Sequence, residues 1–327
     1  VPILHSHRHK TMGKKIGLIA TGGTIAGVQA PDMQTYTAGI VPIGALLDGL
    51  HFEGAEICPM QLANIDSCDM GADLWFALVR AVDAALANMD GIVITHGTDT
   101  LEESAFLLQL LVATHKPIVL TGANHPSNAL GADGLRNLHN ALCVACSDNA
   151  HGVLVTMNDT IFAPDCYKAT TFGADCFAAH NGALGYVQQG AVHFLRTESR
   201  KLPHFAARSP EGFARVEILL SYAHNGLGAI LGALKEDGVR GVVVAGSGAG
   251  NVHFALKQAL ASQAHGLTIV CASRVARAFV APAMLQAPQW IAAGYLSPFA
   301  ARILLALLLG SGATHGEIAR AFALFGG

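Results

Sequence analysis

The sequence predicts an α/β protein with two α/β domains: a larger N-terminal one with a layered, mostly parallel sheet and flanking helices, and a smaller C-terminal parallel-sheet one. Three observations lead to this fold class. Short runs of β-branched residues alternate with longer segments of helical period. The periodicity is lost over residues 196–213, which gather arginine, lysine, proline and serine. A second alternating series follows. We therefore expect domains at residues 1–195 and 214–327, joined by a linker at 196–213.

The first series is centred on residues 92–95, where the run Ile-Val-Ile-Thr is typical of a parallel strand buried on both faces. A helix should start at Thr100, because Thr100 and Glu103 have the spacing of a capping box. Residues 31–39 are expected to form a loop or hairpin. The other expected elements are strands at 15–20, 56–60, 117–120 and 152–155, helices at 41–50, 72–86 and 134–146, and a hairpin at 184–195.

The second series repeats the alternation after the linker. Its apolar run 303–309 is too short to span a bilayer, so we expect it in the core. The expected elements are strands at 216–220, 241–245 and 268–272, and helices near 227–234, 254–265, 298–309 and 315–325.

The composition bears on partners and redox state. Of 327 residues, 52% are hydrophobic and only 13% are charged, so we expect a homo-oligomer that buries apolar surface. The formal net charge of -3, without a basic stripe, argues against nucleic acid and membrane partners. The seven cysteines show neither disulfide-scaffold nor zinc spacing. We therefore expect structural thiols, no metal site and no cofactor.

Glycine-rich turns follow several expected strands. Residues 21–27 read Thr-Gly-Gly-Thr-Ile-Ala-Gly, which lets the backbone approach a ligand but does not have the dinucleotide or nucleotide spacing. A second such turn, residues 246–251, is a weak signal alone. After the central strand come Thr98, Asp99 and Thr100, which either face a ligand or only cap a helix.

Polar side chains gather where parallel strands end, the edge at which open α/β sheets bind ligands. This set suits acyl transfer by an activated hydroxyl, since a threonine nucleophile needs a base and an oxyanion hole. A lysine can be that base once burial lowers its pKa. The aspartate either orients the lysine or pairs with a substrate ammonium. The hydroxyl residues at strand ends are Thr24, Ser67 and Thr98, and the neighbouring loops carry Tyr36, Asp99 and Lys168.

Two long motifs, residues 20–27 and residues 95–100, together resemble the signature pair of the bacterial-type L-asparaginase family. The resemblance covers almost the whole chain, because shorter motifs are also similar and occur in the same order. These shorter motifs lie at residues 36–39, 64–67, 132–134, 157–160 and 249–251.

The resemblance implies hydrolysis of L-asparagine to L-aspartate and ammonia, often with some glutamine hydrolysis, and no cofactor. It implies a homotetramer, a dimer of intimate dimers, in which a partner's C-terminal domain completes each site. Thr24 then resembles the acylated nucleophile, with Tyr36 beside it on a mobile flap. Thr98, Asp99 and Lys168 resemble a second catalytic group that activates either Thr24 or the water.

For the substrate, the resemblance implies that Ser67 and Asp99 hold the α-carboxylate and the α-ammonium. The backbone of Ala123 would face the amide, and Asn251 would be the contact from the partner's domain. Cys68 stands where the family often has glutamine, and a thiol is a poor hydrogen-bonding group. One substrate contact is therefore expected to be lost or taken over by backbone.

Two further departures affect recognition and location. Residues 274–289 contain no acidic residue, and Leu285 stands where relatives place an acid that reaches the partner's pocket. We therefore expect a high Michaelis constant for asparagine. Ala87 and His115 stand near the positions of a disulfide in secreted relatives, which favours the cytoplasm over the periplasm. The alternatives are a related amidase or a catalytically idle amino-acid-binding protein on the same fold.

Overall fold

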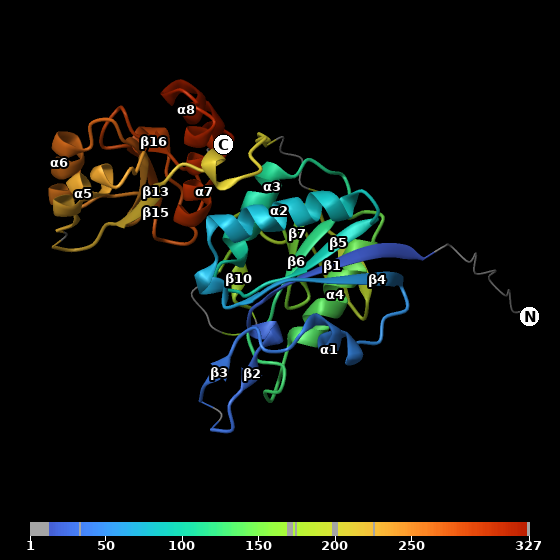
Figure 1. Ribbon diagram of the computed structural model, residues 1–327. Coiled ribbons are helices and arrows are strands. Elements are labelled where there is room, and N and C mark those ends of the chain that lie inside the picture. The colour runs from blue at the N-terminus through green and yellow to red at the C-terminus, as the bar shows by residue number, and fades with distance from the viewer. Residues whose placement is uncertain are drawn as a thin grey trace, which may run out of the picture.

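The computed structural model describes residues 13–32, 34–168, 173, 175–197, 202–224 and 226–325 (Figure 1). Its described residues form two large sheets of different size and two small two-stranded ones. The larger sheet has eight strands in the order β12-β11-β8-β7-β6-β5-β1-β4, and the smaller has four in the order β13-β14-β15-β16. The α/β fold class with a larger and a smaller parallel sheet is therefore confirmed. The division at residues 195 and 214 stays a prediction, and residues 198–201 of the expected linker lie outside the described residues.

Five neighbouring strands of the larger sheet are parallel, so their carboxyl ends meet at one edge. The expected strands are all present, and β4 is longer than expected. Three antiparallel strands extend the other side. The parallel strands are β4 (Ala55–Ile65), β1 (Lys14–Gly22), β5 (Gly91–Thr95), β6 (Ile118–Thr121) and β7 (Val153–Met157), and the antiparallel ones are β8 (Thr160–Phe162), β11 (Gly185–Gln188) and β12 (Ala191–Phe194).

Strand β8 was not expected from the sequence. It pairs back onto β7 through a two-residue turn in which Asn158 and Asp159 have φ values of 46° and 62°. These are two of the residue types that tolerate the left-handed region, and this turn type matches the twist of a hairpin. The polar residues at 158–160 therefore make a hairpin rather than an open loop.

Helices cover both faces of the larger sheet (Figure 1). On one face, α2 and α3 share an apolar cluster with side chains such as Ile92 and Ile94. On the other face, α1 and α4 pack on side chains such as Leu18 and Val93. This alternation along the strands is what a doubly covered parallel sheet requires. The helices are α1 (Ile43–Asp48), α2 (Ala72–Leu86), α3 (Leu101–Leu111) and α4 (Gly134–Cys146).

The expected capping box at the start of α3 is wrong. Thr100 is the N-cap residue, but its side chain makes no capping hydrogen bond. Its hydroxyl donates instead to the backbone carbonyl of Ser67, at 2.8 Å. The carboxylate of Glu103 pairs with Arg302, at 3.4 Å. Tertiary partners have thus displaced the local reciprocal bonds that the spacing predicts.

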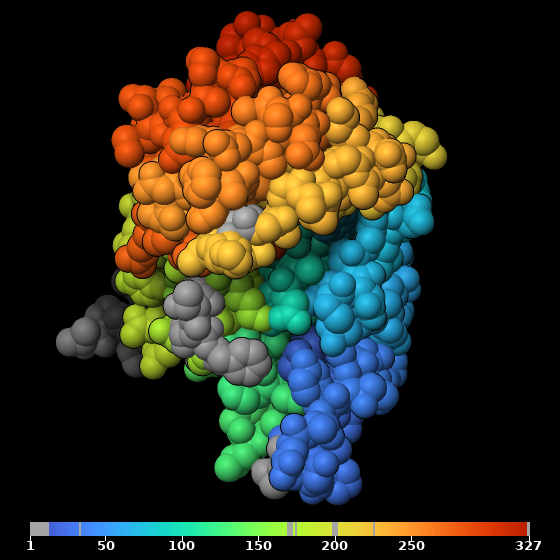
Figure 2. All heavy atoms as spheres, turned by 90° about the vertical axis from the view of Figure 1, so that its left-hand side faces the viewer, coloured from blue at the N-terminus to red at the C-terminus, as the bar shows by residue number. Residues whose placement is uncertain are grey.

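The smaller sheet is wholly parallel, and helix α7 joins it to the larger unit. Residues 303–309 of α7 are buried, as expected, and they share the cluster that includes α3. In Figure 2 the C-terminal residues, coloured yellow to red, sit directly on the N-terminal residues. The elements are β13 (Val216–Leu220), α5 (Leu231–Glu236), β14 (Gly241–Gly246), α6 (Phe254–Gln263), β15 (Thr268–Ser273), β16 (Ile291–Ala292), α7 (Pro298–Gly310) and α8 (His315–Ala323).

Two details of the smaller unit differ from expectation. The helix expected near residues 227–234 begins as a 3-10 helix, Leu227–Ile230, before α5 continues it. Strand β16 was not foreseen, because two residues are too few to give a period. Within the described ranges, no helix is both long and apolar enough to cross a membrane.

Candidate active site

The expected hydroxyl residues lie at the carboxyl ends of adjacent strands. Thr24 follows β1 in a 3-10 turn, Ser67 follows β4 in another, and Thr98 follows β5. Ala123 follows the next strand, β6. All four residues are buried. Since β4, β1, β5 and β6 are consecutive in the sheet, these four positions share one edge.

Glycines bring three of these turns into direct contact. A Cβ at Gly23 would lie 2.4 Å from the Cα of Gly97, and Gly23 also has φ +77°. A Cβ at Gly97 would lie 2.5 Å from the Oγ of Ser67. Any side chain at either glycine would therefore push the turns apart. The turns that carry Thr24, Thr98 and Ser67 form one continuous surface.

Lys168 meets the central turn from a separate small hairpin. It ends β9 (Tyr167–Lys168), which pairs with β10 (Phe177–Ala178). Its Nζ donates to the Oγ1 of Thr98, at 3.1 Å, and pairs with the Oδ1 of Asp99, at 2.5 Å. The lysine side chain is 20% exposed, so it is less buried than we expected. The structure thus brings Thr98, Asp99 and Lys168 together, with Asp99 paired to the lysine.

Tyr36 approaches the same edge from the hairpin of β2 (Val28–Gln29) and β3 (Tyr36–Thr37). Its hydroxyl and the hydroxyl of Thr24 are hydrogen-bonded, at 3.0 Å. Tyr36 is exposed, whereas Thr24 is buried beneath it. The pair therefore lies between the buried carboxyl ends of the strands and the solvent.

Ser67 and Cys68 have opposite environments. Among the described residues the Oγ of Ser67 has no hydrogen-bond partner, although it is buried. A buried hydroxyl normally finds a partner, so this oxygen is available to a ligand group. Cys68 is exposed, and desolvation, followed by the charges of Asp66 and Asp69, raises the pKa of its thiol. Cys68 is therefore a neutral thiol at neutral pH.

The candidates in the smaller sheet lie apart from this group. Asn251 is exposed, and its backbone bonds to Ser247 within the turn after β14, at 2.7 and 2.9 Å. Within the described part of the chain, no hydrogen bond joins Asn251 to the residues around Thr24. Leu285 follows a 3-10 helix (Pro282–Met284) and packs, half-buried, on the apolar cluster of the smaller sheet.

Two buried ionisable groups behind the site were not singled out from the sequence. Glu102 accepts a hydrogen bond from the backbone N–H of Lys168, at 3.3 Å, and burial raises its pKa to about 8. His96 is fully buried, and burial lowers its pKa to about 4. Glu102 looks in the sequence like an ordinary acidic residue of a first helical turn. Only the folded chain shows that it contacts Lys168, which is 66 residues away in the sequence.

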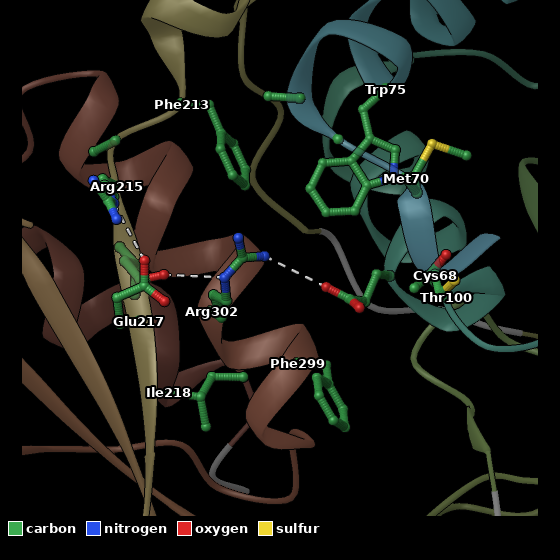
Figure 3. Close-up of a pocket in the computed structure, with 15 residues that line it drawn as sticks. Cys68, Met70, Trp75, Thr100, Phe213, Arg215, Glu217, Ile218, Phe299 and Arg302 are labelled. Carbon is green, nitrogen blue, oxygen red and sulfur yellow. Dashed lines mark hydrogen bonds and ion pairs between the residues drawn. The ribbon is translucent and has the colours of Figure 1, made fainter. Parts of the chain in front are cut away.

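A cleft of about 570 Å³ lies beside this edge, between α2 on one side and β13 and α7 on the other (Figure 3). Cys68 and Thr100 line it, but Thr24, Thr98 and Lys168 do not. Arg302 reaches across it to Glu103. No group of three His, Cys, Asp or Glu side chains that could hold a metal ion occurs within the described ranges. The cleft therefore lies next to the cluster of Thr24, Thr98 and Lys168 but is not lined by these residues.

Comparison with known proteins gives one consistent result. The family model described as "Asparaginase, N-terminal" matches residues 15–200, and "Glutaminase/Asparaginase C-terminal domain" matches residues 215–322. The chain is 37% identical to L-asparaginase 2 of Escherichia coli, over 90% of this chain and 88% of that protein. It is 37% identical to glutaminase-asparaginase of Acinetobacter glutaminasificans, over 89% and 94%. The crystal structure of a probable cytoplasmic L-asparaginase from Campylobacter jejuni superposes with a TM-score of 0.87, at 35% identity and 95% and 99% coverage.

Proposed function

This chain belongs to the asparaginase/glutaminase family, and we propose that it hydrolyses L-asparagine to L-aspartate and ammonia, with weaker hydrolysis of glutamine. The observation that carries the proposal is the contact of Lys168 with both Thr98 and Asp99, beside the Thr24–Tyr36 pair. A hydroxyl within hydrogen-bonding distance of a group that can activate it is what nucleophilic amide hydrolysis requires. The glutaminase part is supported by the names of the family model and of the Acinetobacter relative.

In the proposed reaction the side-chain amide of asparagine lies over Thr24 and Thr98. Either the Oγ1 of Thr24 attacks the amide carbon and forms an acyl-enzyme, or Thr98 and Lys168 activate a water that attacks it. In both routes the carbon–nitrogen bond breaks, ammonia leaves and one water is consumed. The backbone of Ala123 is proposed to face the amide side of the substrate. No cofactor or metal takes part.

Substrate orientation is proposed to depend on the two charged groups of asparagine, its α-carboxylate and its α-ammonium. The buried, unpartnered Oγ of Ser67 binds the α-carboxylate, and Asp99 binds the α-ammonium. Cys68 contributes little, since its thiol is neutral and a weak hydrogen-bonding group. Because this leaves one carboxylate for the ammonium, the Michaelis constant for asparagine should be high.

The assembly is proposed to be a homotetramer, a dimer of intimate dimers, with Asn251 of a partner completing each site. The separation of Asn251 from the Thr24 group within one chain supports this. An active, monodisperse monomer in light scattering would refute it. We place the protein in the cytoplasm, since all seven cysteines are free thiols.

The decisive experiment measures ammonia release from free asparagine, free glutamine and amide groups in larger acceptors. Rapid release from asparagine and slower release from glutamine are expected. Release only from a larger acceptor would indicate a related amidase. Binding of asparagine without ammonia release would indicate an idle amino-acid-binding protein.

A further inference from the structure

A chain of buried hydrogen bonds lies directly beneath the turn that carries Thr98. The indole N–H of Trp75, on α2, donates to the Oγ of Ser104, on α3, at 2.9 Å. The Oγ of Ser104 is 2.8 Å from the Nε2 of His96. The Nδ1 of His96 is 2.8 Å from the carbonyl oxygen of Gly97. All three side chains are buried, and those of Ser104 and His96 are completely so.

The direction of each bond follows from the chemistry of its ends. An indole N–H can only donate, so the oxygen of Ser104 accepts from Trp75. The carbonyl oxygen of Gly97 can only accept, so the Nδ1 of His96 must carry the proton that is donated to it. In the neutral ring Nε2 is then unprotonated, and it accepts the proton of Ser104. His96 is therefore the neutral tautomer with its proton on Nδ1, and that N–H donates to Gly97. Burial, which lowers the pKa of His96 to about 4, keeps the ring uncharged at neutral pH.

The carbonyl at the end of this chain belongs to the most crowded residue of the site. Gly97 contacts Gly23 on one side and Ser67 on the other, too closely for any Cβ. Its peptide plane leads directly into Thr98, whose hydroxyl accepts from Lys168. A rotation of this peptide would move Thr98 relative to Lys168, and it would disturb the contacts with the turns of Thr24 and Ser67.

We propose that Ser104 and His96 are positioning residues, which hold the Gly97–Thr98 peptide in the orientation that aligns Thr98 with Lys168. This inference rests on the proposed function, because the aligned pair matters only if Thr98 takes part in amide hydrolysis. Neither residue touches the substrate. Their effect is exerted through one backbone carbonyl, and it depends on the proton being on Nδ1 rather than on Nε2.

The test compares three variants of the full-length enzyme. Ser104→Ala removes the hydroxyl, so the Nε2 of His96 loses its hydrogen bond and the ring is anchored only through Nδ1. Ser104→Thr keeps the hydroxyl and is the conservative rescue. Lys116→Met is the matched control, since Lys116 bonds to the carbonyls of Leu86 and Met89 near the start of β6, at the opposite edge of the sheet. Its loss should affect stability alone.

Ser104→Ala should lower kcat about tenfold or more per folded molecule and change KM by less than about threefold, because misplacement of a catalytic group affects the chemical step. Ser104→Thr should recover most of the loss, and Lys116→Met should keep the wild-type kcat. An unchanged kcat in Ser104→Ala, or a loss confined to KM, would overturn the proposal.

Nitrogen NMR of the His96 ring gives a second readout that does not depend on activity. The wild type should show the neutral form protonated on Nδ1 at pH 7. Ser104→Ala should keep the proton on Nδ1, because the Gly97 carbonyl can only accept, but its Nε2 signal should shift since that nitrogen has lost its hydrogen bond. A wild-type ring protonated on Nε2 would overturn the proposal. If the wild type released no ammonia from asparagine, the proposed function would fail. The ring signals would then still decide whether the hydrogen-bond chain sets the tautomer.

Discussion

Two glycine-rich turns follow parallel strands in this protein, but only one lies among reactive side chains. The turn after β1 presses Gly23 against Gly97 of the neighbouring strand's turn. The turn after β14 closes on itself, since a Cβ at Gly246 would lie 2.5 Å from the backbone of Gly250. Ser247 and Asn251 complete that closure with backbone bonds at 2.9 and 2.7 Å.

The difference shows that a glycine-rich turn does not by itself make a site. In the larger sheet the glycines remove the space between turns, so hydroxyls from different strands approach one another. In the smaller sheet the glycines only tighten one turn, and its polar side chain Asn251 points to solvent. The following predictions test whether this difference in packing is also a difference in function.

The largest effect is expected for Thr24→Ala. Loss of the hydroxyl at the first turn should lower kcat for asparagine by roughly 10³-fold or more, because the proposed reaction places the substrate amide over Thr24 and Thr98 in both routes. Thr268→Ala, which removes a threonine hydroxyl at the start of β15, is the control and should keep wild-type activity. Wild-type turnover in Thr24→Ala, with an unchanged melting temperature, would mean that the first turn is not the site.

Adding one methyl group to each turn tests whether its close packing matters for catalysis or only for stability. Gly97→Ala and Gly246→Ala introduce a Cβ at 2.5 Å from existing atoms, so each should destabilise the protein by about 1–3 kcal/mol. Gly97→Ala should also lower kcat, by about 10²-fold, since it separates Thr98 from Thr24 and Ser67. Gly246→Ala should act on KM and not on kcat, since its turn carries Asn251, the proposed contact from the partner's domain. Urea unfolding and steady-state kinetics measure both quantities. A similar fall in kcat in the two variants would contradict the account.

An added acid near the second sheet should improve substrate binding. Leu285→Glu puts the acid at the position that the resemblance implies, but Leu285 is half-buried. Met284 is exposed, so Met284→Glu should disturb the packing less. One charge-assisted hydrogen bond to the α-ammonium should lower KM about tenfold. Asp99→Asn should raise KM. If neither glutamate variant lowers KM and Asp99→Asn leaves it unchanged, the ammonium is bound elsewhere.

The pH dependence of stability should come from the larger unit, since in the described residues His96 and Glu102 are buried there and the smaller unit buries no such charged group. Glu102 has its pKa raised from 4.5 to about 8, so its contribution is complete below pH 4.5 and is lost as pH rises to 8. His96 has its pKa lowered from 6.5 to about 4, so it costs stability as pH falls through that range.

Glu102→Gln isolates the first of these contributions. The amide resembles the protonated acid, so the variant should gain on the wild type between pH 4.5 and 8, by up to about 1.4 kcal/mol per pH unit. Free energies of unfolding measured across this range check the sign. A difference that does not change with pH would show that Glu102 titrates normally.

Local sequence signals were sufficient for most of the fold. Helices α2 and α4 begin and end at the expected residues, because their apolar period is strong over the whole length. The failures come from tertiary contacts. Thr100 and Glu103 do not form the expected capping box, because they bond instead to Ser67 and Arg302, which are distant in sequence. Strands β8 and β16 are too short to show a period.

The residues of the candidate site also differ in how far the sequence alone identifies them. Thr24 and Thr98 could be named from the sequence because a strand's carboxyl end and a resemblance both pointed to them. Lys168 could be named because it was expected in a neighbouring loop and the resemblance also pointed to it. Glu102 and His96 could not, since their importance lies in burial and in partners that no local pattern reveals. Neither residue differs in type from an ordinary helix-start acid or a core histidine.

A double-mutant cycle on Thr98 and Lys168, with ammonia release from asparagine as the readout, tests whether these two residues act together in catalysis. Their side chains are hydrogen-bonded at 3.1 Å, and the account treats them as one functional unit. Thr98→Ala and Lys168→Met should each lower kcat by roughly 10²–10³-fold, and the double variant should lose little more. Wild-type turnover in either single variant, or losses that multiply in the double variant, would contradict it.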